Sequence, residues 1–102
     1  MSHQLALERW AQLLRPVFPV QAALEVRYDL CQLSFSWPLS HVVAIFIAPK
    51  AVEDFLSAQD DARARADYNL REFVKDNFRQ LKTRHQGEFR IVVASIDFVP
   101  LP

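Results

Sequence analysis

The pattern that most suggests chemistry in this sequence is a row of cationic side chains. They recur every three or four residues after a tyrosine, and they are Arg71, Lys75, Arg79 and Lys82, with Tyr68 before them. On a helix, residues at these spacings share one narrow sector of the surface. A basic ridge with an exposed aromatic ring can contact a phosphate backbone through its cations and stack a base on the ring. These five residues are therefore the candidate contacts for nucleic acid or another anion.

The charges around this row permit a second interpretation. Residues 63–85 contain seven Lys or Arg against three Asp or Glu, whereas residues 50–61 contain one Lys against four acids. Glu72 and Asp76 interrupt the row, and ion pairs on a solvated helix face explain the same pattern. The whole chain has twelve basic and twelve acidic residues, which counts against a strong nucleic-acid binder.

A nucleophile is the second candidate for chemistry, because the chain has one cysteine, Cys31. A thiol becomes reactive when a base lies close, and His41 can approach Cys31 across a hairpin, with Asp29 as the orienting acid. The alternative is a small, unreactive side chain, which is the usual state of a lone cysteine in a strand. We favour this alternative and expect no catalytic residue.

Metal and cofactor sites find no support in the sequence. His3, His41 and His85 lie on different predicted elements, and none pairs with another ligand at metal-binding spacing. Gly87 is the only glycine, whereas phosphate-cradling loops need several because the backbone must approach the anion closely. We therefore expect neither a metal nor a cofactor.

Helix and strand patterns indicate the scaffold that holds these side chains. Residues 3–15 have the spacing of an amphipathic helix that Ser2 caps and Pro16 ends. Residues 22–37 alternate like a strand, but the apolar residues change parity near Cys31, which predicts either a bulge or two short strands. In residues 41–48 the odd-numbered and the even-numbered positions are both mainly apolar, which is typical of a central strand covered on both faces.

The longest periodic segment is helical and occupies residues 49–87. Its apolar stripe keeps one phase but weakens to alanines over residues 57–66, where Gln59 and Arg63 turn inward. Either the helix breaks there, with Ser57 or Asp60 as a new N-cap, or one rod of about 50 Å projects past the sheet towards a partner. A last strand is predicted over residues 88–99.

These elements predict a single α+β domain over residues 1–102, a two-layer α/β sandwich of order α-β-β-α(-α)-β. The first two strands pair antiparallel, and the long helical segment crosses over to a parallel third strand, giving a small three-stranded mixed sheet of order 1-2-3. If the helices lie on one face, Val42, Ala44 and Phe46 leave the other face apolar, and a partner subunit must cover it.

The element order is similar to that of the bacterial-type KH domain, a fold that binds single-stranded RNA. The resemblance spans most of the chain and is one of topology. That family clamps RNA with a Gly-x-x-Gly loop between two helices, and the corresponding stretch near Ser57–Asp61 has no glycine. No binding residue is therefore carried over from the resemblance.

Composition indicates a soluble protein of the cytoplasm. The chain cannot form an internal disulfide, and it has neither a signal-peptide pattern nor an apolar run of about 18 residues, so we expect no membrane contact. The leading hypothesis is a small non-catalytic domain that acts through protein–protein contacts and self-association. The alternative is a weak binder of nucleic acid or another polyanion through the basic face of the long helix.

Overall fold

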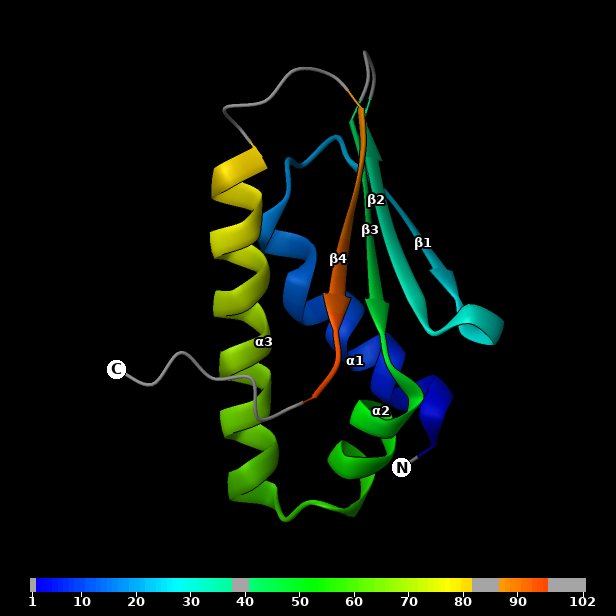
Figure 1. Cartoon of the computed structure of the whole chain (residues 1–102), viewed down its shortest axis with the longest axis vertical. Helices are drawn as coiled ribbons and strands as arrows, with labels where there is room; N and C mark the ends of the chain where they lie inside the picture. The colour runs from blue at the N-terminus through cyan, green and yellow to red at the C-terminus, as the bar shows by residue number, and fades with distance from the viewer. Residues whose placement is uncertain (1, 38–40, 82–86, 96–102) are drawn as a thin grey trace.

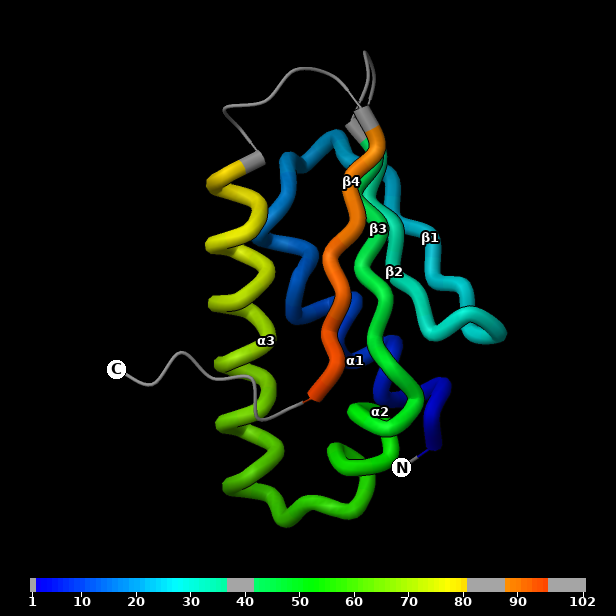
Figure 2. Tube along the Cα trace, viewed as in Figure 1, coloured from blue at the N-terminus to red at the C-terminus, as the bar shows by residue number. Residues whose placement is uncertain are grey.

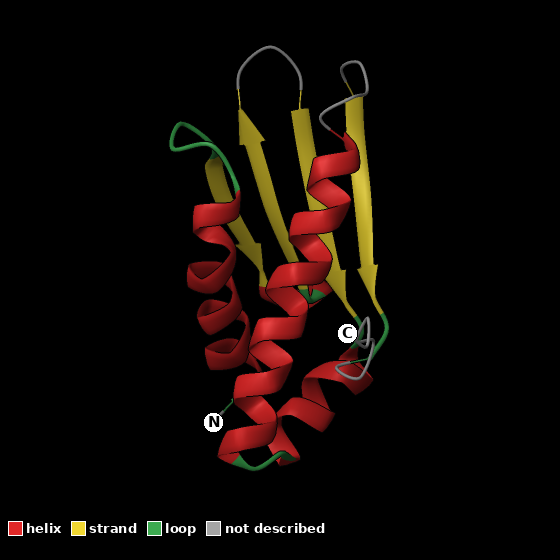
Figure 3. Cartoon of the chain, turned by 90° about the vertical axis from the view of Figure 1, so that its left-hand side faces the viewer, coloured by secondary structure: helices red, strands yellow, loops and turns green. Residues whose placement is uncertain are grey.

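The molecule has two layers, with α-helices packed on one face of a mixed β-sheet (Figures 1 and 3). The structure is a computed structural model and describes residues 2–37, 41–81 and 87–95. In chain order the elements are α1 (His3–Leu14), the 3-10 turn η1 (Arg15–Val17), β1 (Ala23–Arg27), the 3-10 turn η2 (Tyr28–Leu30), β2 (Gln32–Trp37), β3 (His41–Ile47), α2 (Pro49–Ser57), α3 (Asp60–Leu81) and β4 (Gly87–Val93). The predicted α+β class is confirmed.

The described strands form one sheet in the order β1-β2-β3-β4. β1 pairs antiparallel with β2, and β2 with β3, whereas β3 pairs parallel with β4. The parallel pair requires a crossover, which α2 and α3 supply. Figure 2 shows α3 running along the length of the molecule, to the left of β4 in this view. The apolar segment β3 is central, as predicted, and the charged segment β1 lies at an edge.

The sheet has four strands where three were expected, because residues 22–37 fold back on themselves. Leu24 and Val26 of β1 and Leu33 and Phe35 of β2 all belong to the core side. In one straight strand the change of parity would send one pair to the opposite face. The turn η2 and Cys31, whose φ of 48° is left-handed, make the reversal. Two short strands, and not a bulge, thus resolve the parity change.

The core lies between the two layers and begins with α1. Ser2 caps this helix, since its Oγ accepts a backbone hydrogen bond from the first turn at 3.2 Å. Trp10 is fully buried and meets the Phe55 ring of α2 edge to face, with ring centroids 4.7 Å apart. Phe18, which follows η1, stacks on Phe35 of β2 at 4.1 Å. These aromatic contacts fix α1 and η1 against the sheet and α2.

The long periodic segment is two helices and not one rod. α2 ends at Ser57, α3 begins at Asp60, and the Arg63 N–H donates to the Gln59 carbonyl at 2.8 Å. Gln59 is therefore the N-cap residue, where Ser57 or Asp60 was expected. The break falls in the alanine-rich stretch, because that stretch offers too little apolar surface to hold a continuous helix against the sheet. The alternative prediction, a single rod that projects towards a partner, is therefore wrong.

No described helix covers the outer face of the sheet (Figure 3). The outer face consists of the side chains that point away from the helices, and strand pairing arranges them in three rows: Ala23, Ser36, Val42 and Glu88; Glu25, Ser34, Ala44 and Arg90; and Arg27, Gln32, Phe46 and Val92. Val42 and Val92 are 37% and 56% exposed, and Phe46 is half-buried. Of the three apolar residues that the sequence predicted on this face of β3, Val42 and Phe46 are therefore uncovered, whereas Ala44 is only 4% exposed.

Candidate functional site

The predicted cations line a groove between α3 and η1. The described lining residues are Pro16, Val17, Arg71, Lys75, Phe78 and Arg79. The groove has a volume of ≈ 420 Å³. The helical repeat places its three cations one turn apart on the same side of α3, as the sequence spacing predicted. Lys82, the fourth predicted cation, lies outside the described residues.

Contacts on both sides hold η1 in place. Arg15 donates through Nη1 to the Pro19 carbonyl at 3.2 Å and through Nη2 to the Val20 carbonyl at 2.7 Å, which closes the connector after α1. Phe18 is buried and meets Phe78 of the groove edge to face, with centroids 4.9 Å apart. The groove therefore rests on the core and is formed before any ligand arrives.

The groove is electropositive because its cations are only weakly neutralised. Arg71 lies 3.9 Å from Glu72 and Arg79 lies 3.8 Å from Asp76, which are long separations between partly exposed groups. Among the described residues, none forms an ion pair with Lys75. None of the described lining residues is acidic.

Tyr68 is on the surface, as its place on the basic ridge predicted. It is 55% exposed, and the guanidinium carbon of Arg71 lies 5.6 Å from the centroid of its ring. This cation–π contact puts a cation of the groove beside the ring. Tyr68 itself is not one of the described lining residues.

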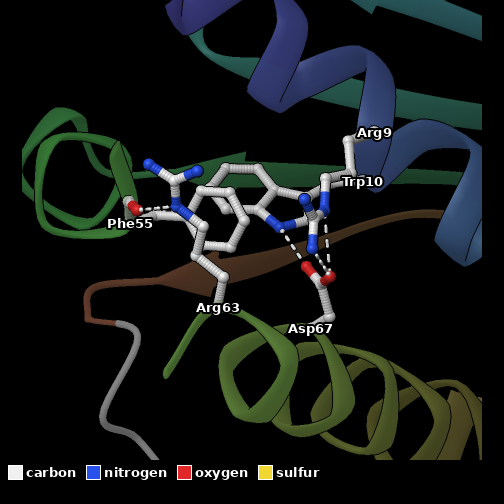
Figure 4. A network of polar contacts seen from close by, with 5 residues as sticks. All are labelled: Arg9, Trp10, Phe55, Arg63 and Asp67. Carbon is white, nitrogen blue, oxygen red and sulfur yellow. Dashed lines mark hydrogen bonds and ion pairs between the residues drawn. The ribbon is translucent and has the colours of Figure 1, made fainter. Parts of the chain in front are cut away.

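The first half of α3 holds a second set of charges, centred on Asp67 (Figure 4). The Asp67 side chain is 17% exposed. Its Oδ2 accepts a hydrogen bond from Arg9 Nε at 2.9 Å, and its Oδ1 accepts one from Trp10 Nε1 at 3.1 Å. Asp67 is not among the site residues predicted from the sequence. The sequence did contain one signal for it. Asp67 follows the inward-turned Arg63 by four residues and so lies near the same side of the helix, and a carboxylate that is buried there needs a polar partner.

Arg63 closes the turn between α2 and α3. Its Nε donates to the Phe55 carbonyl at 3.1 Å, and its Nη2 donates to the Leu56 carbonyl at 2.6 Å. Both carbonyls lie in the last turn of α2, where helical partners run out. The guanidinium carbons of Arg9 and Arg63 also lie 5.2 and 5.7 Å from the centroid of the Phe55 ring (Figure 4). The Asp67 network, which comprises Arg9, Trp10, Phe55, Arg63 and Asp67, thus joins α1, α2 and α3.

The structure does not bring together Cys31, His41 and Asp29, the three residues that the sequence suggested for a cysteine-dependent site. The Ile47 N–H donates to the Cys31 carbonyl at 2.9 Å, so Cys31 lies beside the last residue of β3, whereas His41 is its first. Six residues of strand separate the two positions by about 20 Å. Asp29 is exposed in η2. Within the described part of the chain, no three His, Cys, Asp or Glu side chains are grouped to hold a metal ion.

Tyr28 has a perturbed pKa that arises from a contact on the surface. Its hydroxyl donates to Glu8 Oε1 at 2.9 Å. This hydrogen bond, together with a small loss of hydration and the charge of the Glu8 carboxylate, raises the pKa of Tyr28 above the ordinary value of 10.0. The pair joins η2 to α1 and does not belong to the groove.

Comparison with known proteins gives no match, whether to protein-family models, to curated proteins or to solved structures. The similarity to the KH domain therefore rests on element order. The turn where that fold places its Gly-x-x-Gly loop is here the turn that Arg63 closes. Of the helices that the structure describes, none has the length and apolar character to cross a membrane.

Proposed function

We propose that the protein is a small non-catalytic domain that acts through protein–protein contacts, and that two copies associate through the outer faces of their sheets. The observation that supports this proposal is the outer face, which no described helix covers and whose centre is apolar. Val42, Phe46 and Val92 surround Ala44 there. Stacking two such faces removes Val42, Phe46 and Val92 from water, as in sheet-on-sheet packing.

The charges on the outer face favour a second copy of the chain as the partner. Glu25 of β1 and Arg90 of β4 share one row of the strand pairing, at opposite edges of the sheet. A two-fold axis parallel to the strands and midway between β2 and β3 places β1 of each copy opposite β4 of the other. Each Glu25 then faces Arg90 of the partner subunit, and this favourable pair occurs twice. In the same row the small Ser34 faces Ala44 of the partner subunit, which lets the sheets approach closely.

Sedimentation velocity over a wide concentration range tests the association. We expect the mass to rise from monomer to dimer with concentration. The Ser34→Arg variant places a long cation at the centre of the outer face, and it should remain monomeric with an unchanged circular dichroism spectrum. Ser57→Arg, on an exposed position of the helical layer, is the matched control and should still form dimers. A wild-type protein that stays monomeric at every concentration contradicts the proposal.

Charge reversal tests the two-fold arrangement. Glu25→Arg and Arg90→Glu each place like charges opposite one another twice, and each should weaken association by at least about tenfold. Both side chains are exposed, so the fold itself should tolerate either change. An equimolar mixture of the two variants restores opposite charges at both positions, and a heterodimer should form as tightly as the wild-type dimer. A mixture that associates no better than its components excludes this arrangement.

A second candidate function is the binding of single-stranded nucleic acid or another polyanion along the basic ridge. The exposed cations Arg71, Lys75 and Arg79, aligned beside Tyr68, favour it. Three phosphate contacts from these described cations predict a shallow salt dependence, with log K falling by about 2 for each unit of log salt concentration. Titration with a single-stranded oligonucleotide at several salt concentrations, followed at the amide resonances of these residues, measures that slope. Absent or salt-independent shifts contradict this second function.

A further inference from the structure

We infer that the groove between η1 and α3 is a binding site for a small, free aromatic phosphate. Such a ligand carries a compact anionic group on a flat apolar ring. The inference is independent of self-association, because the groove lies in the helical layer and the outer face lies on the opposite side of the sheet (Figure 3). It also differs from the binding of a polymer along the ridge, because it uses the concave part of the surface.

The size of the groove fits a ligand of this kind. Its volume of ≈ 420 Å³ falls within the range of small-molecule sites, about 300–1,000 Å³. Its two walls come from elements that are fixed to the core, through Arg15 at η1 and through the Phe18–Phe78 contact. A site that is already formed does not have to order its side of the interface on binding, which favours affinity for a small molecule.

The apolar part of the groove comes from both walls. Phe78 is 8% exposed and sits between the cations of α3, while Pro16 is exposed and Val17 is half-buried on η1. A flat ring that enters the groove contacts these three side chains and leaves water. Inorganic phosphate alone would leave the exposed Pro16 and the half-buried Val17 in contact with water, so these two side chains indicate an organic ligand.

The charged part of the groove is matched to a phosphate group. Arg71, Lys75 and Arg79 are spaced over about 12 Å of helix, and long side chains from the two outer positions can converge on an anion at the level of Lys75. Arginine offers a planar fork of donors to phosphate oxygens, and lysine adds a point charge. A phosphate monoester carries a charge of about −1.5 to −2, which suits three cations better than the single charge of a carboxylate.

The same cations repel one another when no anion is present. Arg71 and Lys75, and likewise Lys75 and Arg79, are like charges four residues apart on one helix. Their carboxylate neighbours Glu72 and Asp76 lie outside the described lining of the groove. A phosphate strand that follows the ridge passes these carboxylates, whereas a small ligand inside the groove does not. This difference favours a small ligand over a polymer.

Titration of the full chain by NMR with three probes tests the inference. The probes are phenyl phosphate, inorganic phosphate and phenol. Phenyl phosphate has both the anionic group and the ring, inorganic phosphate has the anionic group alone, and phenol has the ring alone. We expect phenyl phosphate to shift the amide resonances of Val17, Arg71, Lys75, Phe78 and Arg79 to saturation. It should bind at least about tenfold more tightly than either fragment, because only the intact probe uses both parts of the groove.

Matched variants separate the groove from general attraction to a basic helix. Lys75→Gln removes the central cation and should weaken phenyl phosphate binding by about tenfold, the loss of one charge-assisted hydrogen bond. Arg65→Gln removes an exposed cation of α3 that lies outside the groove lining, and it should leave the affinity unchanged. Val17→Thr keeps the shape of the wall but replaces one methyl group with a hydroxyl, and it should reduce the preference for phenyl phosphate over inorganic phosphate.

Several results would overturn the inference. These are equal affinities for phenyl phosphate and inorganic phosphate, saturable shifts confined to residues outside the groove, and equal losses in Lys75→Gln and Arg65→Gln. A single-stranded oligonucleotide that displaces phenyl phosphate at a lower concentration than the probe itself would assign the groove to a polymer instead. The monomeric Ser34→Arg variant should bind phenyl phosphate like the wild type, so failure of this site and failure of self-association give different results.

Discussion

The two halves of α3 use the same residue types in different ways. In the first half, Asp67 and Arg63 are joined to α1 and α2 by hydrogen bonds of 2.6–3.1 Å. In the second half, Arg71 and Arg79 lie 3.9 and 3.8 Å from carboxylates of their own helix, and Lys75 has no ion pair among the described residues. The boundary between the two regimes is one helical turn, from Asp67 to Arg71.

This difference separates charges that hold the fold from charges that remain available to a ligand. A partly buried charge with short hydrogen bonds is costly to remove, because its buried partners lose a hydrogen bond that water cannot replace. An exposed cation with distant partners contributes little to stability. Removing one charge from each half, and comparing the effects on unfolding, tests the distinction directly.

The largest effect is expected for Asp67→Ala. This change leaves the buried Trp10 Nε1 and the Arg9 guanidinium without their acceptor, and it should lower the free energy of unfolding by about 2–3 kcal/mol. The melting temperature should fall by about 10–20 °C. Asp76→Ala is the matched control in the second half and should change the free energy of unfolding by less than about 0.5 kcal/mol. Equal effects of the two variants would remove the distinction between the halves.

Arg63→Gln should have the next largest effect. The variant loses the two bonds that close the end of α2, and the free energy of unfolding should fall by about 1–2 kcal/mol in urea denaturation. Hydrogen exchange should rise first at the backbone of the α2–α3 turn. Arg65→Gln, two residues later and exposed, should leave both measurements unchanged. Uniform exchange across the whole chain would indicate that Arg63 does not act at this turn.

The features of the fold that the sequence predicted are those encoded by local periodicity. Apolar residues on both parities placed β3 at the centre of the sheet, and the parity change near Cys31 located the reversal between β1 and β2. The weak stripe over residues 57–66 located the helix break as one of two alternatives. The number of strands was not predicted, because a change of parity fits a bulge and a turn equally well until the packing of Leu24 and Phe35 is known.

The site was predicted only on the side that α3 supplies. Helical spacing placed Arg71, Lys75 and Arg79 on one sector, but nothing in the sequence brings residues 16 and 17 to them. That contact depends on how Phe18 seats η1 against the core. The partners of Asp67 are 57 and 58 residues away along the chain, and no local pattern names them. Long-range packing therefore decides both the groove and the Asp67 network.

The smallest expected effect has the opposite sign and concerns Lys75→Gln. The change removes two like-charge contacts at i,i+4, with Arg71 and Arg79, and no ion pair with a described residue, so the free energy of unfolding should rise by about 0.2–0.5 kcal/mol at low ionic strength. Added salt screens such repulsion and should abolish the gain, which urea denaturation at several salt concentrations can measure. A loss of stability would place Lys75 with the structural charges of the first half. A gain that coincides with weaker binding of phenyl phosphate is the expected signature of a residue kept for a ligand and not for the fold.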